Sequence, residues 1–402
     1  MRVALDSLAA FGRTGDRGGG RAADSLEALT GVPAYCDLTR VTLVDADGLS
    51  AFLGDAATRI AVPFDGALSG RAVVSYERSF AARVADALGT GDGALPEVAN
   101  ILTSGFVDAW AEQVDGTIDV DPPETVADPA AVVDDAAVAD GAAFVFESRV
   151  ALADVDGACQ FAVLPDVDPF LAYLDGGADA PSAERFAAYA QLTAESAAAV
   201  ADHLAVMTGL DPDGVESHLG FVPVQRVPAL LDDDAYEGAV FETEGAVDAV
   251  VAVLFDEREP GVVADAVLPG DDYDPAIAES AVAELGNVAA SGVVDGWANA
   301  VDTTIDVSTP SHVRDDGRAV LDTVAAAYGR QADAVTVVDA TVALGADLTC
   351  RVCAFPSPRD VDALGEVADA LADGETTDSH AGSDQPDFPP EDASGDRGDG
   401  RE

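Results

Sequence analysis

One stretch of the chain places polar residues on a single face of a helix, and it does so twice. In the first copy the polar positions are spaced by three, four and four residues: Glu97, Asn100, Ser104 and Asp108. The second copy repeats this spacing 187 positions later: Glu284, Asn287, Ser291 and Asp295. At about 100° per residue, four such positions form one narrow stripe, and apolar residues fill the rest of the circumference. The pattern predicts two amphipathic helices, each with one polar stripe.

The similarity extends beyond the stripes. Residues 97–123 and 284–310 are identical at fifteen of 27 positions without a gap, and both tryptophans of the chain lie there. After each helix, Thr-Ile-Asp-Val alternates at period two as a half-buried strand does, and Pro123 or Pro310 follows. A repeat this long is typical of two tandem domains rather than of a solenoid.

The order of predicted elements is the same in two units, so the sequence predicts an α+β fold. The domain limits are 1–178 for the first unit, 179–373 for the second and 374–402 for an acidic, disordered tail. Residues 1 to about 31 are expected to form one helix with a glycine-rich interruption, and a further helix is expected at 125–138. Gly18 to Gly20 do not form a phosphate loop, because no strand precedes them and no Lys-Ser/Thr follows. About nine extra residues of the second unit are expected in a loop near DPDGVESHLG.

The charge of the chain indicates the solution environment in which it folds. The net charge is -55, and all 20 basic residues are arginine. Molar salt shortens the Debye length to about 3 Å and screens such repulsion, so a halophilic, archaeal-type cytoplasm is the simplest environment. Scattered arginines exclude a nucleic-acid surface, and no apolar run is long enough for a membrane span. Four cysteines are too few for a disulfide scaffold.

These residues resemble the motif of the CheC family of chemotaxis phosphatases (CheC, CheX and FliY type). That motif has Ser or Asp, then Glu, then Asn, then a distant Pro. The second copy matches it throughout: Ser280, Glu284, Asn287 and Pro310. The first copy matches at Glu97, Asn100 and Pro123 but has Gly93 at the first position. The resemblance implies two fused units, each a largely antiparallel sheet flanked by long helices, with an internal pseudo-twofold axis.

The resemblance also implies a reaction, the hydrolysis of the aspartyl phosphate on a CheY-type response regulator. A carboxamide can orient the attacking water, and the glutamate can anchor a cationic group of the regulator. The implied catalytic residues are Glu97, Asn100, Glu284 and Asn287. The supporting residues are Ser280, Ser104, Ser291, Asp108, Asp295, Pro123 and Pro310. No metal site or cofactor of its own is implied, because Mg²⁺ would arrive on the regulator.

In the family, the first helix of each unit carries a second motif. The corresponding positions hold other residues: Arg13 and Asp16 in the first unit, Gln191 and Ala194 in the second. One site for each unit is therefore expected. Two alternatives stay open. The stripes can serve as docking surfaces for a CheD-type deamidase or a motor-switch component without turnover, or they can be structural and pack against a sister helix or cap a loop.

Overall fold

A computed structural model of the chain describes most of residues 5–357. The described residues are 5–45, 53, 56, 58–89, 91–127, 137–138, 142–155, 157–174, 183–232, 234–256, 262–268, 274–300, 303–345 and 348–357. The tail predicted at 374–402 and the boundary predicted at 178/179 lie outside them, so both stay predictions.

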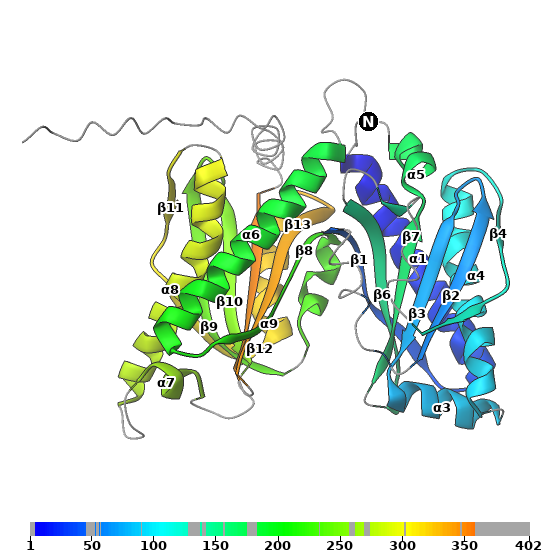
Figure 1. The fold of residues 1–402 in the computed structure, drawn as a ribbon, viewed down its shortest axis with the longest axis horizontal. Coiled ribbons are helices and arrows are strands. Elements are labelled where there is room, and N and C mark those ends of the chain that lie inside the picture. The colour runs from blue at the N-terminus through cyan, green and yellow to red at the C-terminus, as the bar shows by residue number, and fades with distance from the viewer. Residues whose placement is uncertain are drawn as a thin grey trace, which may run out of the picture.

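Along the chain, the first unit begins with a long helix, and strands both precede and follow a second long helix (Figure 1). Its elements are α1 (Leu5–Thr30), β1 (Ala34–Asp45), β2 (Thr58–Gly66), β3 (Gly70–Tyr76), α3 (Arg78–Leu88), the short 3₁₀ helix η1 (Gly91–Ala94), α4 (Leu95–Gln113), β4 (Ile118–Val120), β5 (Glu124–Val126), β6 (Ala142–Leu152), β7 (Ala158–Pro165) and α5 (Val167–Leu174).

The second unit repeats the order of the long helices and the strands, and its described residues also include the 3₁₀ helix η4 and the helix α9. Its elements are α6 (Ala183–Thr208), β8 (Pro212–Pro223), the 3₁₀ helix η4 (Val224–Leu230), β9 (Ala235–Gly245), β10 (Ala249–Asp256), α7 (Val262–Val267), α8 (Pro275–Ala300), β11 (Ile305–Val307), β12 (Ser311–Asp316), α9 (Gly317–Tyr328), β13 (Ala334–Leu344) and β14 (Leu348–Pro356).

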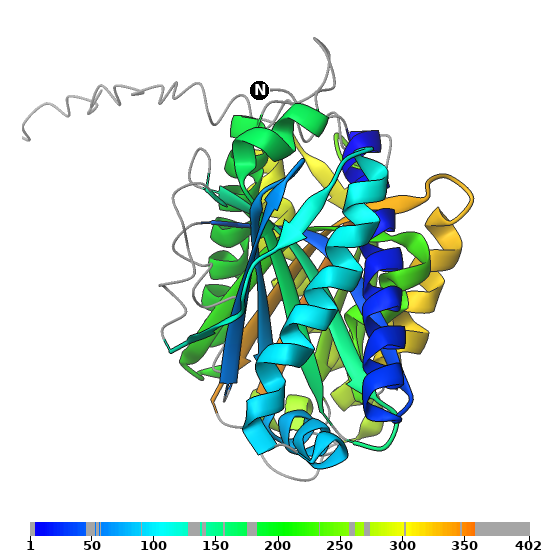
Figure 2. The same cartoon turned by 90° about the vertical axis from the view of Figure 1, so that its right-hand side faces the viewer.

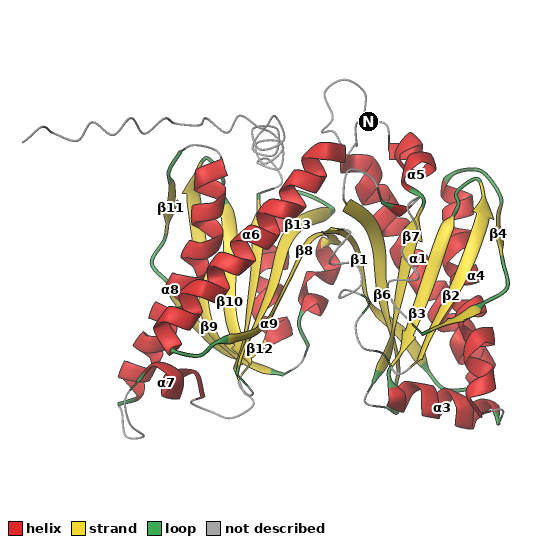
Figure 3. Cartoon of the chain, in the orientation of Figure 1, coloured by secondary structure: helices red, strands yellow, loops and turns green. Residues whose placement is uncertain are grey.

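Each unit has internal pseudo-twofold symmetry. The strand order of the first unit is β1-β6-β7-β3-β2-β4, and the pairing is antiparallel throughout. The order reads the same when the half β1, β2, β3 is exchanged with the half β4, β6, β7, so the axis lies between β3 and β7. The second unit has the matching order β8-β13-β14-β10-β9-β11. The predicted α+β fold, with long helices flanking largely antiparallel strands, is confirmed (Figure 3).

Among the described residues the two units share one sheet of 14 strands, which the sequence did not suggest. Strand β1 pairs with β8 through Val41↔Phe221, Thr42↔Gly220 and Leu43↔Leu219. The middle pair joins equivalent residues, because 42 plus the offset of 178 between α1 (first unit) and α6 (second unit) is 220. A second pseudo-twofold axis therefore passes through the joint between the units, as in an isologous dimer contact.

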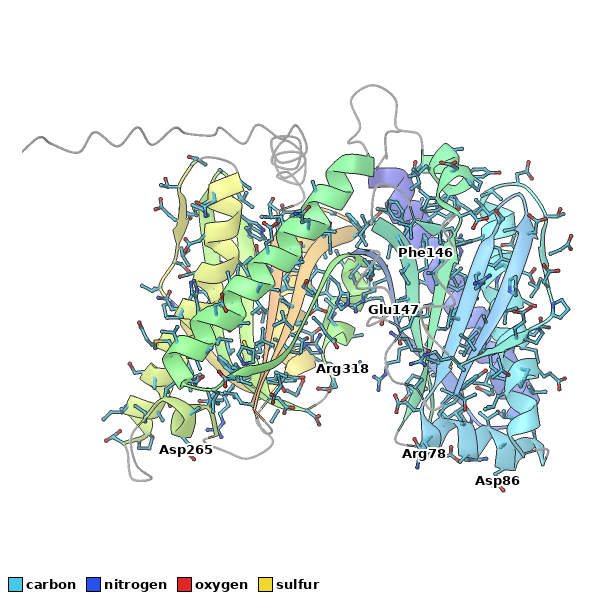
Figure 4. The ribbon with its side chains drawn as sticks, in the orientation of Figure 1. Arg78, Asp86, Phe146, Glu147, Asp265 and Arg318 are labelled. Atoms are coloured by element: carbon cyan, nitrogen blue, oxygen red, sulfur yellow. The ribbon has the colours of Figure 1, made fainter. Side chains whose placement is uncertain are left out.

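A buried ion network lies at this joint. Arg40 on β1 binds Glu147 on β6 (Nε to Oε2, 2.5 Å) and Asp339 of the second unit (Nη1 to Oδ2, 2.9 Å), and Figure 4 labels Glu147 beside the joint. Arg351 also binds Asp339, at 3.2 Å. Arg40, Glu147 and Asp339 are 8%, 7% and 3% exposed. Buried charges need partners, and Arg40 supplies one to a carboxylate of each unit, so removing Arg40 would leave a buried charge uncompensated.

The network shifts the acid-base behaviour of its members. Burial favours the protonated form of Asp339, but Arg351 and Arg40 outweigh that effect and hold its pKa well below the ordinary range. Glu147 likewise has a lowered pKa, since Arg40 outweighs burial. His218 pairs with Asp339 across β8 and β13, and burial followed by the charge of Arg40 lowers its pKa. The joint is therefore expected to be more stable at neutral than at acidic pH.

Helices α1 and α4 lie side by side on one face of the first unit, seen in blue and cyan in Figure 2. Glycine makes the close approach possible. A Cβ added to Gly18 would lie 3.0 Å from the Cα of Phe106, and one added to Gly105 would lie 3.1 Å from the backbone nitrogen of Ala22. The matching Gly292 meets Val200 in the same way, at 2.9 Å. The glycine that both copies share, Gly105 and Gly292, is therefore explained by close helix packing.

Three details of the sequence-based prediction need correction. The expected interruption of the first helix is wrong, because α1 is continuous through its glycines. The helix expected from Thr125 is wrong at its start, because residues 124–126 form β5, whose pairing with β2 begins directly after a proline. The extra residues of the second unit do not lie near 211–220, which is mostly strand β8. Gly70 and Ala249 both pair with the proline that ends the last strand of their unit, at an offset of 179. The offset is 187 at α4 and α8, so eight of the nine extra residues fall between β10 and α8.

Candidate functional site

The two polar stripes lie on equivalent helices and have the same pattern of exposure. The first polar stripe is on α4: Glu97, Asn100, Ser104 and Asp108. The second polar stripe is on α8: Glu284, Asn287, Ser291 and Asp295. In both, the glutamate and aspartate are exposed while the asparagine and serine are half-buried. The structure therefore brings together the predicted residues within each stripe.

The opposite side of each helix explains why the stripe points outward. Val98, Leu102 and Trp110 of α4 are fully buried, as are Leu285, Ala289 and Trp297 of α8. Trp110 lies within an aromatic cluster, with its ring centroid 4.6 Å from that of Phe146. Burial of a large aromatic side chain fixes the rotation of a helix about its axis, and with it the direction of the stripe.

The serines of the two stripes have a structural role that the sequence did not reveal. The hydroxyl of Ser104 donates to the carbonyl oxygen of Asn100 at 2.8 Å, and that of Ser291 donates to the carbonyl of Asn287 at 2.9 Å. Such a bond to the preceding turn keeps the serine side chain on the helix surface. The serines therefore support the asparagine backbone and are not free donors.

The side chains of the asparagines and glutamates are not used by the fold. Among the described residues, Glu97, Asn100, Glu284 and Asn287 have no hydrogen bond or ion pair with another side chain or with the backbone through their side chains. A half-buried carboxamide with free donors and acceptors is ready to bind a ligand or water. This observation weighs against the interpretation that the stripes pack against a sister helix.

The two sites differ at the start of their helices. Glu97 is the third residue of α4, within its first turn, where the positive end of the helix dipole stabilises its charge. Glu284 is the tenth residue of α8, which begins at Pro275, so it lacks that stabilisation. Ser280 is exposed on α8, whereas its counterpart Gly93 belongs to η1. The second site is thus the more complete and has the less compensated carboxylate.

Neighbouring charges differ as well. Arg21 on α1 binds Glu112 of α4 through two hydrogen bonds, at 3.1 and 2.8 Å, and its charge also acts on Asp108. The counterparts of Arg21 and Glu112 in the second unit are Ala199 and Asn299, at the unit offsets of 178 and 187. Asp295 therefore lacks the arginine that accompanies Asp108.

The prolines end the short edge strands of each unit. Pro123 lies between β4 and β5, which both pair with β2, and Pro310 lies between β11 and β12, which both pair with β9. Proline cannot donate to a ladder, so it divides the edge strand in two. Their supporting role in the reaction stays a prediction.

The first-helix positions of the first unit face the other unit. Asp16 binds Arg226 of η4 at 2.7 Å, and Arg13 lies 4.0 Å from Asp333. On α6, Gln191 binds Glu195 of its own helix at 3.0 Å, and Ala194 has no polar side chain. None of these positions therefore provides a free carboxamide.

No cluster of three or more His, Cys, Asp and Glu with metal-binding geometry occurs within the described ranges. No helix in the same ranges is both long and apolar enough to cross a membrane.

Comparison with known proteins shows which family the two segments that contain the stripes are similar to. The CheC-like family matches residues 92–126 and 277–314, two segments that contain both stripes and both prolines. Both segments are therefore CheC-like, and the resemblance expected from the motif is confirmed.

A curated relative is a Halobacterium salinarum protein provisionally named a CheY-P phosphatase, CheC1. It is 28% identical over 174 residues, which cover 39% of this chain and 89% of the relative. The origin of this relative in a halophilic archaeon agrees with the acidic composition of the present chain.

Two solved structures align with parts of the chain. FliY of Thermotoga maritima has a TM-score of 0.37 and 14% identity, covering 47% of this chain and 97% of FliY. A chain of the CheX-CheY-BeF3-Mg complex from Borrelia burgdorferi has a TM-score of 0.29 and 15% identity, covering 42% of this chain and 97% of that one.

Proposed function

We propose that this protein hydrolyses the aspartyl phosphate of a CheY-type response regulator in the cytoplasm. The observation that supports the proposal most is the pair of free carboxamides, Asn100 and Asn287, each held at the same half-buried place on a CheC-like helix. The name of the Halobacterium relative supports the same partner.

The proposed reaction needs only a water molecule held in the right position relative to the phosphorus atom. The oxygen of a water molecule forms a new bond to phosphorus as the bond from phosphorus to the aspartyl oxygen breaks. The products are the aspartate carboxylate and inorganic phosphate, which together with the solvent take up the protons of the water. The Asn287 side chain can accept a hydrogen bond from the water through its oxygen and donate towards a phosphoryl oxygen through its nitrogen. No metal held by this protein takes part in the proposal, because Mg²⁺ would be bound by the regulator.

The glutamates have a different role in the proposal. Glu97 and Glu284 are exposed one helical turn from the asparagine, on the same stripe. Each would bind a cationic group of the regulator and so align the phosphoryl group with the carboxamide. Glu284 should bind that cationic group more strongly than Glu97 does, because the dipole of its helix does not offset its charge.

The test is the rate at which a phosphorylated regulator loses phosphate in molar KCl. Asn287→Ala and Asn100→Ala should each reduce turnover at their own site by about 10²-fold, with the larger loss of total activity from Asn287→Ala. The double variant should be inactive. Asn299→Ala is the matched control, because it removes an exposed amide from the same helix 12 residues after Asn287, beyond the last residue of the stripe. A double variant that retains the parent rate would refute the proposed sites.

The alternative function is docking without turnover, with a CheD-type deamidase or a motor-switch component as the partner. It uses the same stripes and predicts a parent protein that binds its partner but leaves the phosphate in place.

A further inference from the structure

We propose that one chain binds two response regulators at the same time, one on each polar stripe. This inference rests on the proposed function, and it concerns the stoichiometry and the independence of the two sites. It follows from where the shared sheet places α4 and α8.

The two stripes lie at opposite ends of the sheet. Helix α4 packs on β2, β3 and β4, and helix α8 packs on β9, β10 and β11. In the strand order, β2 and β9 are nine steps apart. At about 4.8 Å a step, the distance along the sheet is about 43 Å. Figure 1 shows α4 and α8 at the two ends of the molecule.

The stripes also face different directions. Neighbouring strands rotate by about 20°, so nine steps turn the sheet by roughly 180°. Figure 1 agrees, since α6 and α8 lie in front of their strands while α1 and α4 lie behind theirs. A regulator domain of about 120 residues has a radius of gyration of about 14 Å and thus a diameter of about 35 Å. Two such domains fit without contact, and one domain cannot reach both stripes.

The joint prevents the ends from folding towards each other. The β1–β8 pairing makes the sheet continuous, and Arg40 joins Glu147 of one unit to Asp339 of the other in a buried network. On the helix side, Asp16 binds Arg226 across the same joint. Separating the units would break the β1–β8 pairing and the ion pairs that cross it, so we take α4 and α8 to stay at opposite ends of the sheet.

The joint also limits the number of sites to two. Under the internal pseudo-twofold axis, Asp16 on α1 corresponds to Asn100 on α4, and Asp16 is held by the second unit. On α6 the corresponding residue is Ala194, which has no side-chain donor or acceptor. Neither first helix therefore offers a third regulator a free carboxamide at the position of the asparagine.

The experiment measures the mass of the complex by light scattering in molar KCl, with the regulator held in its active form by beryllofluoride and Mg²⁺. The parent should bind two regulators. Glu97→Arg and Glu284→Arg should each bind one, with the affinity of the remaining site changed by less than about twofold, since the sites lie far apart. Glu279→Arg is the matched control, because it makes the same charge change on an exposed part of α8 outside the stripe, and it should still bind two.

The outcomes separate this inference from the proposed function. A parent that removes phosphate but binds a single regulator would overturn the inference alone. Loss of both regulators from either single variant would do the same, because it would show one composite site. A parent that neither binds the regulator nor removes its phosphate would overturn both.

Discussion

Replacing Arg40 by methionine tests whether the buried network holds the two units together. Arg40 is 8% exposed and compensates two carboxylates, Glu147 and Asp339. After the substitution Asp339 keeps Arg351 at 3.2 Å, but Glu147 loses its arginine and keeps the neutral hydrogen bond from Gln160 at 3.1 Å. Removing one partner of a buried ion pair costs about 3–5 kcal/mol, so we expect a loss of that size, mostly through Glu147.

The assay is urea unfolding in molar KCl at neutral pH, with the free energy of unfolding extrapolated to zero urea. Arg83→Met is the control, because its partner Asp154 has a half-exposed side chain (52%), and such surface pairs contribute about 0–1 kcal/mol. Adding Glu147→Gln to Arg40→Met should recover much of the loss, since an amide is cheaper to bury than an unpaired carboxylate. If Arg40→Met and Arg83→Met cost the same, Arg40 does not compensate buried charge and the reasoning is wrong.

Three further predictions concern the whole chain. Lowering the salt towards dilute buffer should lower the melting temperature, because the net charge of -55 is then unscreened, and an unchanged melting temperature would count against halophilic adaptation. Acidification should destabilise the chain, because His218, Glu147 and Asp339 have lowered pKa values and bind fewer protons folded than unfolded. The loss should begin below about pH 6.5 with His218 and grow below about pH 4 with the two carboxyls. His218→Asn should flatten the first part of that dependence. Cleavage between residues 175 and 181 should leave two halves that co-elute in molar salt, since β1 pairs with β8; separation on a sizing column would contradict this.

The sequence by itself was enough to identify the two stripes and the repeat that contains them. Residues on one helix obey a fixed period, so the spacing of Glu284, Asn287, Ser291 and Asp295 determined their common face before any tertiary contact was known. The alternation of Thr-Ile-Asp-Val before Pro310 likewise predicted β11. The internal symmetry came from the family resemblance, and the strand order confirms it.

Only the tertiary structure decided how the units meet. Nothing local in Arg40 or Asp339 shows that they bind across 299 residues of chain, because that contact depends on which sheet edges pair. The period of a helix also does not show which of its polar positions another part of the chain will contact. Asp16 looked like a lost site in the sequence, whereas the structure shows it bound to Arg226 at the joint. Long-range strand pairing is set by the packing of the whole chain, so the direction and separation of the two stripes could be read only from the fold.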